Sequence, residues 1–209
     1  MSELNTNTAG NVTSRSKTHR ITVTAMLSAI AFALMFIEVP LPALIPSFVK
    51  MDISDLPELL AAFSLGPVYG VAVSFLKNLL HALIKGSSSA YIGEICNFAL
   101  GAVFSFFAGW VYRRRKSRKS ALAGALAGTL LMAAFSVPLN YFVVYPAYVT
   151  LYGMPMKAIV GAYHQILPSA NSLIKCLVIF NMPFTFIKGL LVTGICFLIY
   201  KPLSPLLHK

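Results

Sequence analysis

The chain has 209 residues, of which 57% are hydrophobic and only 11% are charged. Soluble domains carry about 25% charged residues, so this chain has too little polar material to cover itself in water. The net charge of +11 does not indicate nucleic-acid binding, because the basic residues stand at the ends of apolar runs and not among solvent-facing polar residues. Lipid is therefore the expected solvent for much of the chain.

Cysteine and histidine give no sign of a disulfide framework or a metal site. The three cysteines, Cys96, Cys176 and Cys196, are odd in number, widely separated and set in or beside apolar segments, which indicates free thiols. The four histidines lack the paired spacing to Cys or carboxylates that is typical of zinc sites. We expect no metal.

The first twenty residues are polar and contain no apolar stretch typical of a cleaved signal peptide. We expect residues 1–19 to form a flexible cytoplasmic tail and residues 20–209 to form one membrane-embedded domain.

Six apolar segments follow the tail. In chain order they are Ile21–Ile37, Leu56–Gly66, Pro67–Ile84, Tyr91–Tyr112, Ala121–Val149 and Leu173–Tyr200. A spanning helix needs about 20 such residues, and the second segment is short. The second and third segments are either one long kinked helix or two helices, and we favour a break because proline disfavours helix in the residue before it. The sequence predicts an all-α integral membrane protein with about six transmembrane helices.

The basic residues orient this bundle. With six spans, the two termini share one side of the membrane with the loop at residues 113–119, and most of the 17 lysines and arginines lie in these three places. Cytoplasmic loops carry an excess of Lys and Arg. We therefore expect both termini to be cytoplasmic.

The loops on the outer side are then residues 38–55, 85–90 and about 150–172. They contain several prolines, few charges and aromatic residues such as Phe48. We expect these loops to fold back as a lid over a cavity between the helices.

Small residues repeat along the first apolar segment. Ala25, Ala29 and Ala33 are spaced four apart, which gives a smooth stripe where another helix can approach closely. Two interpretations remain open for this stripe, packing within the chain and docking of a partner protein in the membrane.

Polar groups inside the apolar segments are the sharper indication of function, because ionisable residues at membrane depth are costly and usually face a cavity or a partner. They are Lys77, Asn78 and His81 in the third segment, Glu94 and Asn97 in the fourth, Asn140 in the fifth, and Asn181, Thr185 and Lys188 in the sixth. One interpretation is a polar-edged ligand site. The other is a structural ion pair in which Lys77 or Lys188 neutralises Glu94.

The stretch before the second segment has the pattern of a helix start. Ser54 or Asp55 is placed to cap the helix, and Glu58 follows Asp55 by three residues. Capping does not exclude a ligand contact from the same loop.

The sequence contains no phosphate-binding G-x-x-x-x-G-K-[ST], no H-E-x-x-H and no G-x-S-x-G. We therefore expect no enzymatic activity, no catalytic residues and no ATP hydrolysis by this chain alone. Uphill transport would need a partner or an ion gradient. No inverted duplication is visible, which counts against a free-standing secondary transporter.

Several short motifs, taken together and in order, resemble the substrate-binding S components of energy-coupling factor (ECF) transporters, and among them the riboflavin-specific RibU type. The resemblance runs from about Thr22 to Leu203. Its marks are the alanine stripe leading into Glu38-Val-Pro-Leu-Pro, Lys50-Met-Asp-Ile-Ser-Asp-Leu-Pro, Ala62-Phe-Ser-Leu-Gly-Pro, Leu76-Lys-Asn-Leu-Leu-His81, Gly93-Glu-Ile-Cys-Asn-Phe98, Asn140-Tyr-Phe-Val-Val-Tyr-Pro146 and Pro183-Phe-Thr-Phe-Ile-Lys-Gly189.

This resemblance implies a six-helix binder in the bacterial cell membrane that captures riboflavin, with no cofactor of its own. It also implies delivery to a transmembrane coupling protein of the EcfT type and two cytoplasmic EcfA-type ATPases, with the stripe at Ala25, Ala29 and Ala33 docking the coupling protein. Asn140 and Lys188 match positions that contact the flavin. The family usually has Asn where Thr185 stands here, and threonine has a shorter reach.

The expected ligand-binding residues are Asn140, Lys188, Thr185, Asn97, Glu94, Asn78, Lys77, His81 and Phe48. The alternatives are an S component for another vitamin such as pantothenate or folate, a stand-alone proton-coupled carrier using Glu94 with Lys77 or Lys188, and a membrane enzyme built on those groups.

Overall fold

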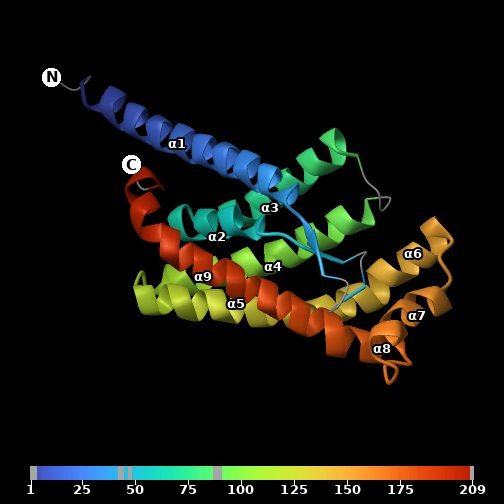
Figure 1. Cartoon of the computed structure of the whole chain (residues 1–209). Helices are drawn as coiled ribbons and strands as arrows, with labels where there is room; N and C mark the ends of the chain where they lie inside the picture. Colours follow the sequence, from blue (N-terminus) through green and yellow to red (C-terminus); the bar gives the residue numbers. More distant parts are fainter. Residues whose placement is uncertain (1–3, 42–44, 47–48, 87–90, 208–209) are drawn as a thin grey trace.

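The computed structural model describes residues 4–41, 45–46, 49–86 and 91–207, and these residues form a bundle of long helices (Figure 1). The elements are α1 (Leu4–Met35), β1 (Val39–Pro40), β2 (Lys50–Met51), α2 (Asp55–Ser64), α3 (Pro67–Ile84), α4 (Ile92–Arg114), α5 (Arg118–Leu139), the π-helical segment η1 (Asn140–Val144), α6 (Tyr145–Tyr152), α7 (Met156–Ile166), α8 (Leu173–Cys176), the π-helical segment η2 (Leu177–Asn181) and α9 (Met182–Leu207). The two strands pair antiparallel, with Val39 opposite Met51 and Pro40 opposite Lys50. The expected all-α character is confirmed.

The chain breaks where the sequence predicts, between α2 and α3. Leu65 follows the end of α2, Gly66 has φ +122°, and Pro67 is the first residue of α3. Glycine reaches this φ without the steric cost that a Cβ brings, and proline is well placed in the first turn of a helix because its missing N–H has no partner there.

Five stretches of the described chain are long and apolar enough to cross a membrane: Lys17–Met35, Pro67–Ile84, Ile92–Arg114, Arg118–Leu151 and Leu173–Ile199. The sixth predicted helix, α2, has only 10 residues and so spans about 15 Å, half of a bilayer core. Nine of those ten residues are buried. The count of six therefore holds only if this short internal helix is included.

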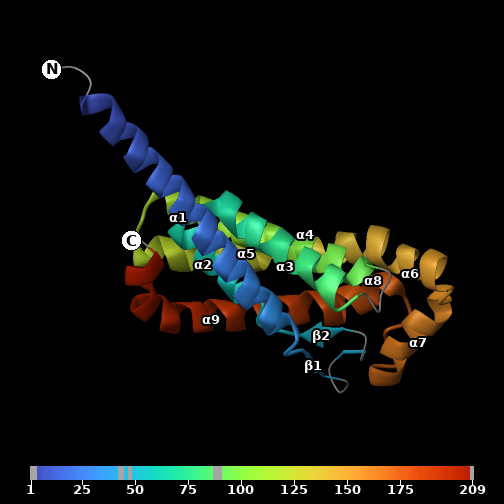
Figure 2. The same cartoon turned by 90° about the horizontal axis from the view of Figure 1, so that it is seen from above.

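The start of α1, the α4–α5 turn and the end of α9 lie at one end of the bundle, while the end of α3, the start of α4 and the helices α6 to α8 lie at the other (Figures 1 and 2). The basic tails and the basic loop are thus at the same end, as the charge pattern predicts. The positive-inside rule makes that end cytoplasmic. Helix α1 begins at Leu4, and the division into a tail at 1–19 and a domain at 20–209 stays a prediction.

Two apolar clusters divide the interior. The inner cluster includes Leu59 of α2, Val73 of α3, Phe104 of α4 and Ala125 of α5. The outer cluster joins Ile45 to α6, α7, α8 and η2 through residues such as Tyr145 and Tyr163. A polar cavity is lined by residues from elements of the inner cluster and from elements of the outer cluster. The fold thus brings both parts of the bundle to this cavity.

The stripe on α1 faces away from the bundle. Val23, Leu27 and Ala31 of α1 are buried, whereas Ala25, Ala29 and Ala33 are exposed. The small residues therefore do not serve packing within the chain, and of the two interpretations of the stripe only an external surface remains.

Candidate functional site

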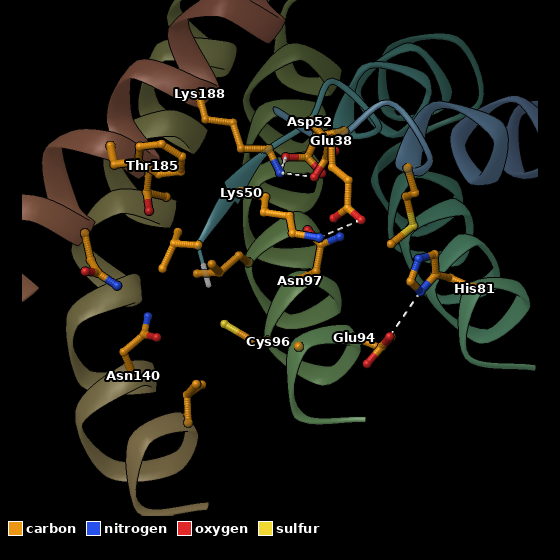
Figure 3. Close-up of a pocket in the computed structure, with 18 of the residues that line it drawn as sticks. Glu38, Lys50, Asp52, His81, Glu94, Cys96, Asn97, Asn140, Thr185 and Lys188 are labelled. Atoms are coloured by element: carbon orange, nitrogen blue, oxygen red, sulfur yellow. Dashed lines mark hydrogen bonds and ion pairs between the residues drawn. The ribbon is translucent and has the colours of Figure 1, made fainter. Parts of the chain in front are cut away.

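A cavity of about 530 Å³ lies at the outer end of the bundle. Its wall is formed by the end of α1, strand β2 and the following loop, the end of α3, the start of α4, the η1–α6 region and the first half of α9. Figure 3 shows Asn140 and Thr185 on one side of the space, with His81 and Glu94 on the opposite side. One wall is therefore neutral and polar, and the other is charged.

The two π-helical segments each place an asparagine on this wall. Asn140 is the first residue of η1 and Asn181 is the last of η2, and both line the cavity. Each segment is followed two residues later by a proline, Pro146 or Pro183. Proline cannot donate the usual helical hydrogen bond, and π-bulges are frequent at functional sites because the widened turn redirects side chains.

Asn181 is held in place by two buried tyrosines. The Tyr163 hydroxyl donates to Asn181 Oδ1 at 2.7 Å, and Asn181 Nδ2 donates to the Tyr145 hydroxyl at 3.3 Å. The two hydroxyl oxygens lie 2.5 Å apart. Burial raises the pKa of Tyr163 well above its usual value, so its hydroxyl stays a proton donor at neutral pH. This network fixes the Asn181 amide at the cavity wall.

Other neutral groups on the wall are left open to a ligand. Asn140 Nδ2 donates to the Ser136 carbonyl oxygen at 2.7 Å, which orients the amide and leaves Oδ1 available. Within the part of the chain that the structure describes, Asn97 and Thr185 have no side-chain hydrogen bond to protein, although both line the cavity. These three groups supply both donors and acceptors.

Lys188 forms the charged corner of the cavity. Its Nζ lies 3.2 Å from Asp52 Oδ2 and 3.0 Å from Asp55 Oδ2 (Figure 3). Burial opposes ionisation of Asp52, but Lys188, Lys77 and two hydrogen bonds from Ser54 outweigh it and hold the pKa of Asp52 far below its usual range. Asp52 is therefore an anion at neutral pH and a fixed counter-charge for Lys188.

Lys77 lies behind this corner and does not reach the cavity. Its side chain has no exposed surface, and its Nζ lies 2.7 Å from Asp55 Oδ1 and 2.5 Å from Glu58 Oε1. It also donates to Ser54 Oγ at 2.7 Å. The Ser54 hydroxyl in turn donates to Asp52 Oδ1 at 2.5 Å. Ser54 is the N-cap residue of α2, but its side chain makes no capping hydrogen bond, because these two partners occupy it.

Glu38, Lys50 and Lys85 form a second charged group on the cavity wall. Glu38 Oε1 lies 2.9 Å from Lys50 Nζ and 2.8 Å from Lys85 Nζ. Burial raises the pKa of Glu38, but hydrogen bonds and charge from the two lysines outweigh it and lower the pKa below the ordinary 4.5. These ion pairs tie strand β2 to the end of α3 across the cavity.

The structure brings most of the predicted ligand-binding residues together. Those that line the cavity are Asn140, Lys188, Thr185, Asn97, Glu94 and His81. Lys77 and Asn78 do not. Asn78 is buried, and its Nδ2 donates to the Ser74 carbonyl oxygen at 2.8 Å. Phe48 lies outside the described residues.

The ion pair predicted as the alternative is wrong. Glu94 Oε1 lies 3.0 Å from His81 Nδ1, whereas Lys77 and Lys188 pair with Asp55 and other carboxylates near the start of α2. The i, i+4 spacing puts His81 and Lys77 on one face of α3, but Lys77 lies one turn deeper, beside α2, while His81 lies near the outer end of the helix opposite α4.

Sequence reasoning missed several residues on the cavity wall. These are Glu38, Lys50, Asp52, Asp55, Lys85, Cys96, Tyr145, Tyr148, Asn181 and Phe184. Asn181 is a polar residue inside the sixth apolar segment, and this placement was the sequence signal that could have identified it as a cavity residue. Asp52 and Asp55 belong to a stretch that was interpreted as a helix cap, and no local pattern reveals a partner 136 positions away.

Three comparisons place the chain among known proteins. Residues 19–200 match the family model described as "ECF transporter, substrate-specific component". The chain is 37% identical over 190 residues to the riboflavin transporter RibU of Staphylococcus aureus (strain TCH60), covering 91% of this chain and 93% of that one. It is 32% identical over 195 residues to the riboflavin transporter FmnP of Bacillus subtilis (strain 168), covering 92% and 96%.

A solved structure described as the S component of a bacterial ECF transporter resembles the fold with a TM-score of 0.71. The two sequences are 35% identical, and the match covers 92% of this chain and 99% of the other.

Proposed function

Because the chain belongs to the family of substrate-specific components of ECF transporters, we propose that it captures riboflavin at the outer face of a bacterial membrane for import. The observation that carries this proposal is the cavity of about 530 Å³ at the outer end, which has a neutral amide wall facing a charged wall. The relatives named as riboflavin transporters support the choice of ligand.

The chemistry of the cavity suits a flavin. An isoalloxazine is a flat, largely apolar ring system whose pyrimidine edge alternates carbonyl acceptors with an N–H donor, and a hydroxylated tail hangs from its centre. Asparagine amides and a threonine hydroxyl both donate and accept, so Asn97, Asn140 and Thr185 match that edge or tail. Pockets of this kind use a few placed polar groups for orientation and apolar surface for affinity.

Titration with riboflavin tests the proposal directly. The purified protein should quench flavin fluorescence, and excess pantothenate or folate should not restore it. Quenching that one of those vitamins reverses would assign the site to that vitamin, and absence of any flavin binding by folded protein would refute the proposal.

Thr185→Val tests the site with a matched control on the same helix. Thr185 lines the cavity, whereas Thr193 is buried two turns along α9, away from the cavity. Among the residues that the structure describes, the Thr193 hydroxyl has no hydrogen-bond partner. We expect Thr185→Val to weaken riboflavin binding by roughly three- to tenfold, the effect of one hydrogen bond. Thr193→Val should bind as the unmodified protein does, and equal losses in both variants would exclude a direct role for Thr185.

Energy for import must come from partner proteins on this proposal. A transmembrane coupling protein of the EcfT type would dock on the exposed stripe Ala25, Ala29 and Ala33, and two EcfA-type ATPases would supply ATP hydrolysis. Close backbone approach at small residues is what drives helix association in lipid, and the three alanines of the stripe are exposed. None of the three alanines lines the cavity, and this separates docking from capture.

Ala29→Trp tests this separation. We expect the change to abolish ATP-dependent uptake by the complete transporter in vesicles while riboflavin affinity in detergent stays the same. Ile30→Trp is the control, because Ile30 is 49% exposed next to the stripe and already presents a large side chain. If Ala29→Trp loses riboflavin binding together with uptake, the assignment of the stripe as a docking surface would be refuted.

A further inference from the structure

The turn between α4 and α5 concentrates positive charge. Of the seven residues 113–119, all but Ser117 are basic, and all seven are exposed. The turn lies at the end of the bundle that also holds the start of α1 and the end of α9 (Figures 1 and 2). The positive-inside rule accounts for the side of the membrane on which these charges lie, but it does not account for their being gathered in one turn.

These cations are held on a rigid support. Ser120 N donates to Ser117 Oγ at 3.1 Å, which caps the start of α5, and Ser120 Oγ donates to the Val111 carbonyl oxygen of α4 at 3.1 Å. Further along α5, a Cβ on Gly124 would lie 2.6 Å from the Ala108 carbonyl oxygen, so the two helix backbones are in close contact. The basic side chains therefore project from a fixed hairpin tip.

No acid within the described part of the chain neutralises this tip. The described acidic residues are Glu38, Asp52, Asp55, Glu58 and Glu94, and each forms an ion pair with a lysine or histidine inside the bundle or at its outer end. Like charges gathered at this density repel one another, and an anion from outside the chain relieves that repulsion.

Aromatic and aliphatic residues next to the tip, on its side toward the bundle, indicate the depth of the tip in the membrane. Arg114 lies over the Trp110 ring, with its guanidinium carbon 3.8 Å from the ring centroid, and Trp110 is 41% exposed. One turn further from the tip, Phe106 on α4 and Leu126 on α5 are exposed apolar residues. Tryptophan is typical of the headgroup level of a membrane, so the basic side chains one turn beyond Trp110 lie at the depth of the lipid phosphates.

We propose that the α4–α5 tip is a binding surface for the headgroups of anionic phospholipids in the cytoplasmic leaflet. Arginine presents several donors that match phosphate oxygens, and basic clusters directly cytoplasmic of a transmembrane helix attract anionic lipids. Helix α1, which carries the exposed stripe Ala25, Ala29 and Ala33, lies on the opposite side of the bundle from α5 (Figure 1). A partner that docks on that stripe therefore leaves the tip facing lipid.

The single tryptophan of the chain is a built-in reporter for this surface. The full chain is reconstituted in phosphatidylcholine nanodiscs that contain the same small mole fraction of brominated phosphatidylglycerol or brominated phosphatidylcholine, and quenching of Trp110 fluorescence is compared. We expect a preference for the anionic lipid of roughly tenfold or more. Equal quenching by the two lipids would overturn the proposal.

The test variant combines Arg113→Gln, Arg115→Gln and Arg118→Gln, and it keeps Arg114 so that the environment of Trp110 is unchanged. It should lose the lipid preference while retaining its helical circular-dichroism spectrum. Lys157→Gln with Lys175→Gln removes two exposed cations from the outer end and should keep the preference. A preference that survives in the triple variant would overturn the proposal.

Two further measurements identify the source of the anion that binds the tip. Millimolar inorganic phosphate should leave the lipid preference intact, whereas its loss would indicate a site for free phosphate instead. Assembly of the triple variant with the cytoplasmic ATPases should be normal, and failure to assemble together with an unchanged lipid preference would assign the tip to a protein contact and overturn the proposal.

Discussion

The cavity joins two regions that are built by different chemistry. The base consists of α2 with Asp55 and Glu58, Lys77 of α3 and the adjoining turn of α4, and it is held by buried ion pairs. The cap consists of α6, α7 and α8, and it meets the cavity through the neutral hydrogen bonds among Tyr145, Tyr163 and Asn181. The base is charged and buried, whereas the groups through which the cap meets the cavity are uncharged.

Packing reinforces this difference. A Cβ on Gly70 of α3 would lie 2.9 Å from the Glu58 carbonyl oxygen, and a Cβ on Gly101 of α4 would collide with the Glu58 carboxylate. Both neighbouring helices therefore approach α2 at positions where only glycine fits. The cap uses short helices of 8, 11 and 4 residues, which cannot support such continuous contact.

The physical consequence is a difference in the cost of movement. Separating a buried ion pair leaves a charge without a partner in a medium of low dielectric constant, while a neutral hydrogen bond that opens toward a cavity exchanges for one with water. The base is therefore expected to stay rigid during ligand entry. A rearrangement that opens the site costs the least free energy at the cap.

Lys77→Met should have the largest effect, because it leaves Asp55 and Glu58 facing each other inside the base. We expect the free energy of unfolding to fall by about 3–5 kcal/mol, measured by thermal or denaturant unfolding in detergent. Lys175→Met, which changes an exposed lysine, is the control. Adding Glu58→Gln to Lys77→Met should recover part of the loss, and unchanged stability of Lys77→Met would show that the base does not depend on its ion pairs.

Lys188→Met should act mainly on ligand binding, because Lys188 lies on the cavity wall and Asp55 keeps its contact with Lys77. A hydrogen bond from a charged group contributes about 1.5–3 kcal/mol, so riboflavin affinity should fall by about one to two orders of magnitude. Fluorescence titration reports the affinity, and the same unfolding experiment reports stability. A loss of stability as large as in Lys77→Met would place Lys188 in the base.

Tyr163→Phe probes the cap, since it removes the donor to Asn181 Oδ1 and leaves the ring in place. We expect affinity to fall by roughly three- to tenfold, with a smaller loss of stability than in Lys77→Met. Tyr141→Phe is the control, because Tyr141 is exposed on η1 and does not line the cavity. If Tyr163→Phe lowers the free energy of unfolding as much as Lys77→Met does, the proposed difference between the base and the cap would be wrong.

Glu38→Gln should have the smallest effect, because its ion pairs with Lys50 and Lys85 are partly exposed and such pairs contribute little. The pKa of Glu38 is lowered, so these contacts are present at neutral pH and are lost as the pH falls below the ordinary value of 4.5. Riboflavin should dissociate roughly two- to threefold faster from Glu38→Gln at pH 7. At pH 4 the difference from the unmodified protein should narrow, and a difference that widens there would contradict the assignment.

Much of the site was accessible from the sequence because polar residues stand out in apolar segments. Asn97, Asn140, Thr185 and Lys188 were found in this way, and all line the cavity. The same reasoning wrongly placed Lys77 in the ligand site. A lysine at membrane depth indicates that it has a polar partner, but the sequence does not show whether that partner is a ligand or another part of the chain. The partner is α2, whose Asp55 and Glu58 form ion pairs with Lys77.

The sequence by itself determined the membrane character, the break at Gly66-Pro67 and the common side of the two termini, because each follows from local composition, backbone chemistry or charge distribution. Tertiary structure alone decided which carboxylate each lysine meets, since pairs such as Asp52 and Lys188 depend on how α2 and α9 pack. It also decided that the stripe of Ala25, Ala29 and Ala33 faces outward and that η1 and η2 turn two asparagines into the same cavity. Local sequence specifies which groups a helix carries, whereas the packing of the other helices specifies which of those groups meet.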